Sequence, residues 1–258
     1  MEFVDTHCHP HFSDFLPDPG QMINDAKTAG VTKLIAVGTT LADSSRAIDF
    51  AQNHAGIWSS AGTHPHEARE FLADKKSPDR LIKLLNKLSI VAVGEIGLDY
   101  YKNISPADAQ LAALRSQIEA TKHLDLPYIF HVRDAWEDFW KLVDDYSGIR
   151  GVIHSFSAGP KILKQVVDRG FYVGLNGIMT FTRDESQLEA ARQVPLDKLL
   201  LETDAPFLAP APFRGQTCQP KHVVTTAQFL AQLRAEDLAQ FARATTDNAN
   251  KLFTLETK

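Results

Sequence analysis

Cysteines and long apolar runs are what this sequence most clearly lacks. Its 258 residues include two cysteines, Cys8 and Cys218, which are too few for a disulfide framework, so we expect a protein of the reducing cytoplasm. No run approaches the roughly 18 apolar residues of a transmembrane helix. The N-terminus lacks the basic start and apolar core of a signal peptide. These absences predict a soluble protein with no membrane association.

Positive charge is also in short supply. Lys and Arg together number 27 against 32 Asp and Glu, which gives a net charge of −5 and a pI near 6.0. This balance argues against a protein that grips duplex nucleic acid along its length. It leaves open an enzyme that holds a strand end, where bound metal ions supply the positive charge.

What the sequence does contain is a recurring unit of a short apolar run, a turn and a stretch of helical period. The apolar runs are continuous rather than alternating, which is typical of strands buried on both faces of a parallel sheet. Eight such runs occur, at residues 3–5, 34–38, 56–62, 90–94, 128–131, 151–154, 171–174 and 199–202.

Amphipathic helices are expected between these runs, because apolar residues recur there at i, i+3, i+4 and i+7. The pattern is carried by Leu81, Leu84, Leu85 and Leu88, by Trp136, Phe139, Trp140 and Val143, and by Ile162, Leu163, Val166 and Val167. After the eighth run, residues 223–233, 238–242 and 249–253 are expected to form closing helices.

Eight strands alternating with helices predict a (β/α)8 barrel, the TIM-barrel form of an α/β fold. The length is typical of one such barrel, so we expect a single domain over residues 1–258 with C-terminal closing helices. An open doubly wound sheet has the same local pattern and is the alternative.

Several of the predicted strands end in a residue suited to metal binding or catalysis, and in such a barrel the chemistry lies at the C-terminal strand ends. His7 and His9 would project from the same side of the first strand, because side chains alternate. The other strand ends carry Glu95, His131, His154 and Asp204. Each residue alone has an ordinary explanation, as a core histidine or a structural ion-pair partner. Together they predict a site.

Four imidazoles and two carboxylates exceed the three protein ligands usual for one catalytic zinc ion. The set fits two divalent ions that share Glu95, which lies between the histidine pairs in the sequence. Since thiolate ligands are absent, the expected ions are magnesium, manganese or zinc. Cys8 should point away from the histidines and pack in the barrel. Asp204 has a second candidate role, as general base on the attacking water.

Six motifs, taken in order, resemble the TatD family of metal-dependent deoxyribonucleases. They are Phe-Val-Asp-Thr-His-Cys-His at 3–9, Gly-Thr-His-Pro-His at 62–66, Gly-Glu-Ile-Gly-Leu-Asp-Tyr-Tyr at 94–101, His-Val-Arg-Asp-Ala at 131–135, His-Ser-Phe-Ser at 154–157 and Leu-Leu-Glu-Thr-Asp-Ala-Pro at 200–206. The resemblance runs nearly end to end and implies a TIM barrel of the amidohydrolase superfamily.

The resemblance also implies how the ligands are shared and what the protein does. Two ions share one carboxylate: His7, His9, Glu95 and Asp204 hold the first ion, and Glu95, His131 and His154 hold the second. The usual activity of the family is hydrolysis of DNA phosphodiesters, typically as an exonuclease.

His64 and Arg133 are the predicted substrate contacts. The resemblance suggests that His64 meets the substrate or a third metal ion; the ordinary alternative is a loop histidine that holds a turn with Pro65. Arg133 should share a side with His131, and a guanidinium there suits a phosphate. Pairing of Arg133 with a neighbouring carboxylate is the alternative.

Further residues are expected around the ligands. Glu202 is predicted to support a ligand or a third ion, and Asp99 to orient a ligand or to cap its loop. Four aromatic residues of the same rim could stack bases or pack the rim: Tyr100, Tyr101, Phe156 and Phe207.

One loop departs from the family pattern. After the eighth strand the family commonly has Arg-Gly and then Asn-Glu-Pro, whereas this chain has Arg214-Gly215 and then Cys218-Gln219-Pro220. The difference puts substrate contacts from this loop in doubt, but not the metal site.

These features predict a cytoplasmic, monomeric phosphodiesterase that acts on the ends of DNA, with single strands the expected form. The ligand set suits any electrophile attacked by an activated water, so a hydrolase of another ester or amide, such as an aminoacyl-tRNA deacylase, is one alternative. A non-catalytic metal-binding barrel is the other, although it would need neither Asp204 as a base nor Arg133 as a phosphate contact. The choice of DNA or RNA and the polarity of digestion stay open.

Overall fold

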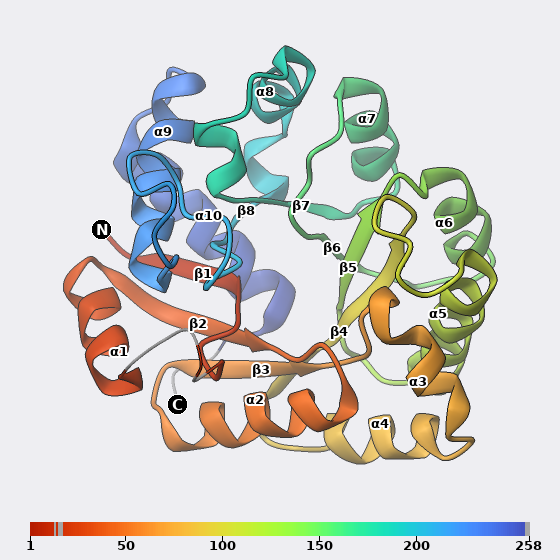
Figure 1. Ribbon diagram of the computed structural model, residues 1–258. Coiled ribbons are helices and arrows are strands. Elements are labelled where there is room, and N and C mark those ends of the chain that lie inside the picture. Colours follow the sequence, from red (N-terminus) through yellow and green to blue (C-terminus); the bar gives the residue numbers. More distant parts are fainter. Residues whose placement is uncertain (13, 15–17, 256–258) are drawn as a thin grey trace.

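Eight parallel strands form the centre of this computed structural model, which describes residues 1–12, 14 and 18–255 (Figure 1). Each strand is hydrogen-bonded to the next in sequence order. The predicted (β/α)8 TIM barrel is therefore confirmed. The strands are β1 (Phe3–Cys8), β2 (Val31–Val37), β3 (Ile57–Ala61), β4 (Ile90–Asp99), β5 (Tyr128–Arg133), β6 (Gly151–Ile153), β7 (Tyr172–Leu175) and β8 (Leu199–Leu201).

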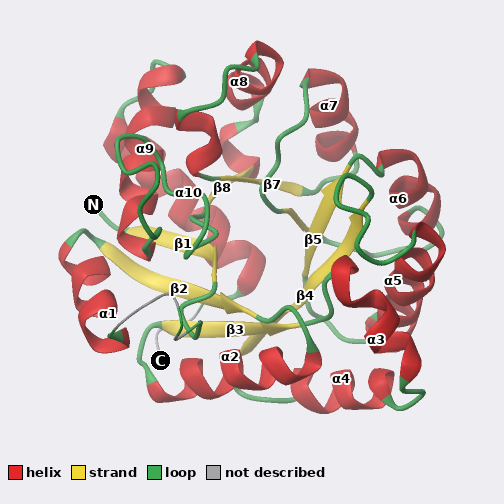
Figure 2. Ribbon diagram, viewed as in Figure 1, coloured by secondary structure: helices red, strands yellow, loops and turns green. Residues whose placement is uncertain are grey.

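The helices surround the strands as an outer ring (Figure 2). They are α1 (Pro19–Thr28), α2 (Leu41–Asn53), α3 (Ala68–Ala73), α4 (Ser77–Leu85), α5 (Ala107–Thr121), α6 (Trp136–Val143), α7 (Pro160–Asp168), α8 (Glu185–Gln193), α9 (Val223–Leu233) and α10 (Leu238–Phe253). Short 3-10 helices lie at η1 (Pro65–Glu67), η2 (Gly177–Thr180), η3 (Leu196–Lys198) and η4 (Pro220–His222). None of the described helices is long and apolar enough to span a membrane.

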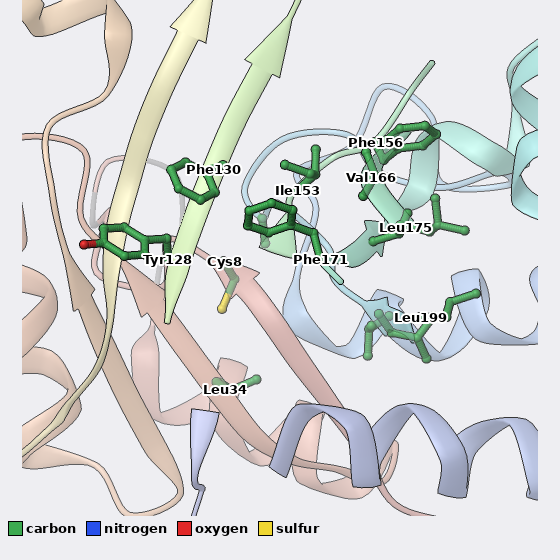
Figure 3. Close-up of a cluster of buried hydrophobic side chains, with 14 of the residues drawn as sticks. Cys8, Leu34, Tyr128, Phe130, Ile153, Phe156, Val166, Phe171, Leu175 and Leu199 are labelled. Carbon is green, nitrogen blue, oxygen red and sulfur yellow. The ribbon is translucent and has the colours of Figure 1, made fainter. Parts of the chain in front are cut away.

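Successive strand residues divide between two apolar clusters, which explains why the strands are continuous apolar runs. In β2, Leu34 belongs to the larger cluster and Ile35 to the smaller. The larger cluster also contains helix residues, so it fills the layer between strands and helices. Phe130 and Phe171 meet in this layer with their ring centroids 5.8 Å apart (Figure 3). Cys8 belongs to the same layer, as predicted from the alternation along β1.

The smaller cluster fills the barrel interior near the N-terminal strand ends. It combines strand residues with Leu252 and Phe253 at the end of α10. Arg150, directly before β6, donates to the carbonyl of Leu252 at 3.0 Å, and Lys33 near the start of β2 donates to the carbonyl of Leu255 at 2.7 Å. The end of α10 therefore closes this end of the barrel.

The barrel closes between β1 and β8 through individual hydrogen bonds. The buried carboxylate of Asp5 accepts the N–H of Thr203 at 2.9 Å and its hydroxyl at 2.6 Å. The N–H of Asp204 donates to the carbonyl of His7 at 2.8 Å. This seam places a histidine of the first strand beside the loop that follows the last strand.

Several elements end at different residues than the sequence predicts, and α4 and β4 differ most clearly. The turn into β4 occupies residues 86–89, so α4 ends at Leu85 and Leu88 lies outside it with 97% of its surface exposed. β4 itself continues to Asp99 instead of ending at residue 94. Glu95 consequently lies within a strand rather than after one.

The last two predicted helices, 238–242 and 249–253, are a single helix, α10. The polar residues between them interrupt the apolar period, but tertiary contacts bury two of them. The side chain of Asn248 donates to the carbonyls of Leu196 at 2.8 Å and Leu199 at 2.9 Å. Thr245 bonds the carbonyl of Phe241 within the helix at 3.0 Å. Burial of satisfied polar groups replaces the missing apolar positions.

Candidate metal centre

The predicted ligands converge at the C-terminal ends of the strands. They come from five different places in the barrel: His7 from β1 and His9 directly after it, Glu95 from β4, His131 from β5, His154 directly after β6, and Asp204 from the loop after β8. All of these except the fully buried His7 line one pocket of about 990 Å³.

Glu95 occupies the middle of the cluster. Its Oε1 lies 2.9 Å from Nδ1 of His131, 2.9 Å from Nε2 of His154 and 3.5 Å from Nε2 of His64. Its Oε2 lies 3.4 Å from Nε2 of His7. The two carboxylate oxygens thus face different imidazoles, which is the arrangement expected of a bridging ligand.

A second carboxylate, Asp204, faces the histidines of the first strand. Its Oδ1 lies 3.6 Å from Nε2 of His7 and 3.4 Å from Nε2 of His9. The carbonyl of Val37 holds the other ring nitrogen of His9 at 2.8 Å, which orients that ring. The rings of His7 and His154 stack with centroids 3.8 Å apart, so the two predicted ligand groups are in direct contact.

Carboxylates also stand behind two of the ligands. Oε1 of Glu202 lies 3.4 Å from Nδ1 of His154, and Oδ2 of Asp99 lies 3.4 Å from Nε2 of His131. A carboxylate behind a ligating histidine fixes the orientation of the ring and raises its basicity. Both residues therefore lie where they can support the metal ligands.

Burial and neighbouring charges together shift the pKa values of the site residues. Burial disfavours the ionised form of Glu95, but His154, His64 and His7 outweigh it and hold the pKa of this carboxyl well below its usual value. Burial likewise opposes charge on His154, whereas Glu95 and Glu202 raise its pKa well above the ordinary value. Burial together with His154 lowers the pKa of His7. His7 is therefore held in the neutral form that binds metals.

The donor set fits divalent metal ions. Both ring nitrogens of His7 are buried and make no hydrogen bond within the described residues, which is costly unless another group occupies the site. Donor atoms of His7, His9 and Glu95 lie within 4.8 Å of one another, as do those of His64, Glu95 and His131. Imidazole and carboxylate donors without thiolates suit zinc, manganese or magnesium. Ions could therefore be held on either side of Glu95.

The two predicted substrate contacts, His64 and Arg133, both line the pocket. His64 lies close enough to Glu95 to meet either an ion or a substrate, while its neighbour His66 is held by Asp99 through a 2.9 Å hydrogen bond. Within the described part of the chain, Arg133 pairs with no carboxylate. Its guanidinium instead lies over the ring of Tyr101, with Cζ 3.8 Å from the ring centroid.

The rim aromatics divide into exposed and packed residues. Tyr101 and Phe207 are 60% and 44% exposed. Of the two options predicted for Phe156, the structure shows packing: its side chain is buried and joins the apolar layer between strands and helices (Figure 3). Tyr100 is half-buried, and its hydroxyl donates to Asp138 at 2.9 Å.

Sequence reasoning missed Asn176 and Arg214 as members of the site. Asn176 directly follows β7, and its side chain donates to Ser155 at 2.9 Å and to Glu202 at 3.4 Å. A polar residue after an apolar strand was the available signal. Arg214 lies in the long loop after β8 with its Cζ 3.7 Å from the centroid of Phe181, and both residues line the pocket. No local pattern predicts that pair.

The residues that depart from the family pattern have structural partners. Cys218 is fully buried, and its N–H donates to the carbonyl of Pro206 at 2.9 Å. Gln219 forms a capping box with His222 at η4. Neither belongs to the pocket lining formed by the described residues. Their effect on substrate contacts stays a prediction.

The chain resembles known proteins over almost its whole length. A family model described as TatD related DNase matches residues 4–254. The chain is 34% identical over 256 residues to a Citrobacter rodentium protein named 3'-5' ssDNA/RNA exonuclease TatD, covering 95% of each chain. It is 32% identical over 251 residues to a Bacillus subtilis protein named uncharacterized metal-dependent hydrolase YabD, covering 96% of this chain and 98% of that one. The crystal structure of YJJV, a TatD homologue from Escherichia coli K12, matches with a TM-score of 0.87 and 31% identity over 98% of both chains.

Proposed function

The chain belongs to the family of TatD related DNases, and from that premise we propose that it hydrolyses phosphodiester bonds at the ends of DNA strands with two divalent metal ions. The observation that carries the proposal is the position of Glu95. Its two oxygens face the imidazoles of different strands, as a carboxylate shared between two ions requires.

The resemblance implies how the ligands would be shared: His7, His9, Glu95 and Asp204 would hold one ion, Glu95, His131 and His154 would hold the other, and His64 would be available to a third. When bound, two such ions polarise the phosphate and lower the pKa of a water molecule.

The protein side chains supply the remaining functions. Asp204 orients the attacking water and accepts its proton; burial opposes its ionisation, but His9 and His7 lower its pKa and keep it ionised. Arg133 binds a non-bridging phosphate oxygen. Burial holds the pKa of His64 well below its usual value, so His64 contacts the substrate as a neutral imidazole.

Single strands are the proposed substrate form. The Citrobacter rodentium relative is named for activity on both single-stranded DNA and RNA, which supports single strands and makes RNA a second substrate to test. The net charge of −5 fits the same choice, because the chain as a whole has no excess of cations to cover a duplex.

Replacing Glu95 by glutamine tests the proposal. Glu95→Gln keeps the size of the side chain but removes the charge that the surrounding imidazoles face. We expect it to lose most of its bound metal, measured by plasma mass spectrometry, and its hydrolysis of labelled single-stranded DNA, while its circular dichroism is unchanged. Glu2→Gln is the matched control, because Glu2 is exposed and precedes β1 at the far end of the barrel.

Each alternative has its own outcome. If Glu95→Gln hydrolyses DNA with undiminished metal-dependent activity, the proposal is wrong. Turnover of an aminoacyl-tRNA but not of DNA by the unaltered protein would favour a hydrolase of other esters. Stoichiometric metal with turnover of neither substrate would favour a non-catalytic barrel.

A further inference from the structure

Two arginines of the pocket wall lie over aromatic rings. Cζ of Arg133 is 3.8 Å from the ring centroid of Tyr101, and Cζ of Arg214 is 3.7 Å from that of Phe181. Arg133, Phe181 and Arg214 line the pocket that contains the predicted metal ligands, whereas Tyr101 is not part of the lining. Arg214 is also anchored by a 2.9 Å hydrogen bond from Nη1 to the carbonyl of Ala209. We call Arg133 with Tyr101 the β5 platform, and Arg214 with Phe181 the β8 platform.

Neither of these two arginines forms a salt bridge with another described residue. Arg169 shows the contrast: it stacks on Trp140 with Cζ 4.4 Å from the ring and also binds the carboxylate of Asp144 at 2.8 and 2.7 Å. Over the residues that the structure describes, Arg133 and Arg214 have the stacking interaction but no carboxylate. Each guanidinium therefore keeps donors for a ligand in the pocket.

The platforms belong to different sectors of the barrel mouth. Tyr101 follows β4 and Arg133 ends β5, whereas Phe181 follows η2 and Arg214 lies in the loop after β8. The strands before the two arginines, β5 and β8, are three strands apart in the eight-stranded ring, and Figure 1 shows β4 and β5 across the barrel from β8. A ligand that reaches from one platform to the other therefore crosses part of the mouth of this pocket, and Glu95 lies in the lining of the same pocket.

Charge is divided between the floor and the walls of this pocket. The floor carries Glu95 and Asp204, which suit metal ions, and the walls carry the arginines. Lys102 adds a third cation, with Nζ 5.8 Å from the ring centroid of Tyr101. A guanidinium matches a phosphate with two parallel hydrogen bonds, and its planar donors lose little freedom when they bind. Each platform therefore suits one phosphate group.

We propose that the two platforms bind different phosphates of one nucleic-acid strand, the β5 platform the phosphate at the metal centre and the β8 platform a second phosphate, so that the protein selects an oligonucleotide over an ester with a single phosphate. This inference rests on the proposed function and deepens it. It also accounts for nucleic-acid binding by an acidic chain, because the needed cations are concentrated at the pocket wall. Bases next to these phosphates can stack on the exposed ring of Tyr101.

The test compares two substrates with the metal-loaded protein. Bis(p-nitrophenyl) phosphate carries one phosphodiester, and a single-stranded deoxyoligonucleotide carries several. Arg214→Ala should raise KM for the oligonucleotide about tenfold, the effect of one charge-assisted contact, and should lower kcat/KM for the oligonucleotide about tenfold more than for the small diester. Arg243→Ala, on the exposed surface of α10, is the matched control and should change neither.

Two further measurements separate a phosphate contact from a general loss of structure. The salt dependence of binding to a cleavage-resistant phosphorothioate oligonucleotide, followed by fluorescence anisotropy, should lose about 0.7 from its logarithmic slope in Arg214→Ala. Phe181→Leu keeps an apolar side chain but removes the ring, and should raise KM in the same direction by a smaller factor.

The outcomes distinguish this inference from the proposed function. If the unaltered protein cleaves both substrates and Arg214→Ala matches Arg243→Ala on the oligonucleotide, the inference is wrong and the proposed function stands. If Arg214→Ala loses activity equally on both substrates, the β8 platform does not select a strand. If the unaltered protein neither binds nor cleaves the oligonucleotide, the proposed function fails and the inference with it.

Discussion

Replacing Thr203 by valine should weaken the seam between β1 and β8 without creating a cavity. The hydroxyl of Thr203 donates to Oδ2 of Asp5 at 2.6 Å and accepts the N–H of Ala205 at 3.0 Å. These groups are buried, so water cannot replace either bond. Valine has nearly the same shape as threonine but neither donates nor accepts a hydrogen bond.

The expected loss in the free energy of unfolding is about 3 kcal/mol. A hydrogen bond to a charged acceptor contributes about 1.5–3 kcal/mol, and a neutral one about 0.5–1.5 kcal/mol. In the variant, the N–H of residue 203 still donates to Oδ1 of Asp5 at 2.9 Å, so the carboxylate keeps one hydrogen-bond partner. We therefore place the loss in the middle of the range obtained by adding the contributions of the two lost hydrogen bonds. Because the same seam holds Asp204 against His7, the variant should also retain less metal.

Urea unfolding followed by circular dichroism measures this loss, with an unchanged m-value as the sign that the unfolded state is the same. Burial raises the pKa of Asp5 to about 7, so the measurement is made above that pH, where the carboxylate predominates. Thr28→Val is the control, since its hydroxyl bonds the carbonyl of Asn24 on the exposed surface of α1, and it should change stability by less than about 0.5 kcal/mol. Equal unfolding midpoints for the two variants would refute the role assigned to the seam.

Three further predictions concern two substitutions and the chemical labelling of the unaltered protein. Asp99→Asn removes the charge behind His131 and should weaken metal binding in a calorimetric titration about 10- to 100-fold; unchanged affinity would contradict a supporting role. Burial opposes ionisation of Asp43, but hydrogen bonds led by that of His11 hold its pKa below the usual 3.8, so its stabilisation is complete above that pH and is lost as the pH falls. Asp43→Asn should therefore flatten the acid side of a plot of unfolding midpoint against pH, and a slope as steep as that of the unaltered protein would refute this. Burial raises the pKa of the Cys218 thiol, so iodoacetamide should label this residue in urea but not in the folded protein at neutral pH; mass spectrometry that finds label in the folded protein would count against its burial.

The sequence by itself predicted the barrel and identified histidines that meet at the C-terminal ends of its strands. His7, His131 and His154 each lie within or next to a short apolar run, and these runs alternate with helical segments. A parallel barrel gathers the C-terminal ends of all its strands on one rim, so a pattern covering a few residues at a time was enough to predict that these side chains meet. The same local reasoning failed where packing overrides periodicity, as for Leu88 and for the polar middle of α10.

Only the tertiary structure decided which side chains meet across that rim. Glu202 stands behind His154, and Arg214 lies on Phe181, although the members of each pair are far apart in the sequence. Phe156 could stack bases or pack according to the sequence, and the structure shows that it is buried. A local pattern records which face of a strand or helix a residue occupies. Contacts between loops of different strands depend on how eight strands close into a ring, and that closure is set by packing and hydrogen bonds between distant segments.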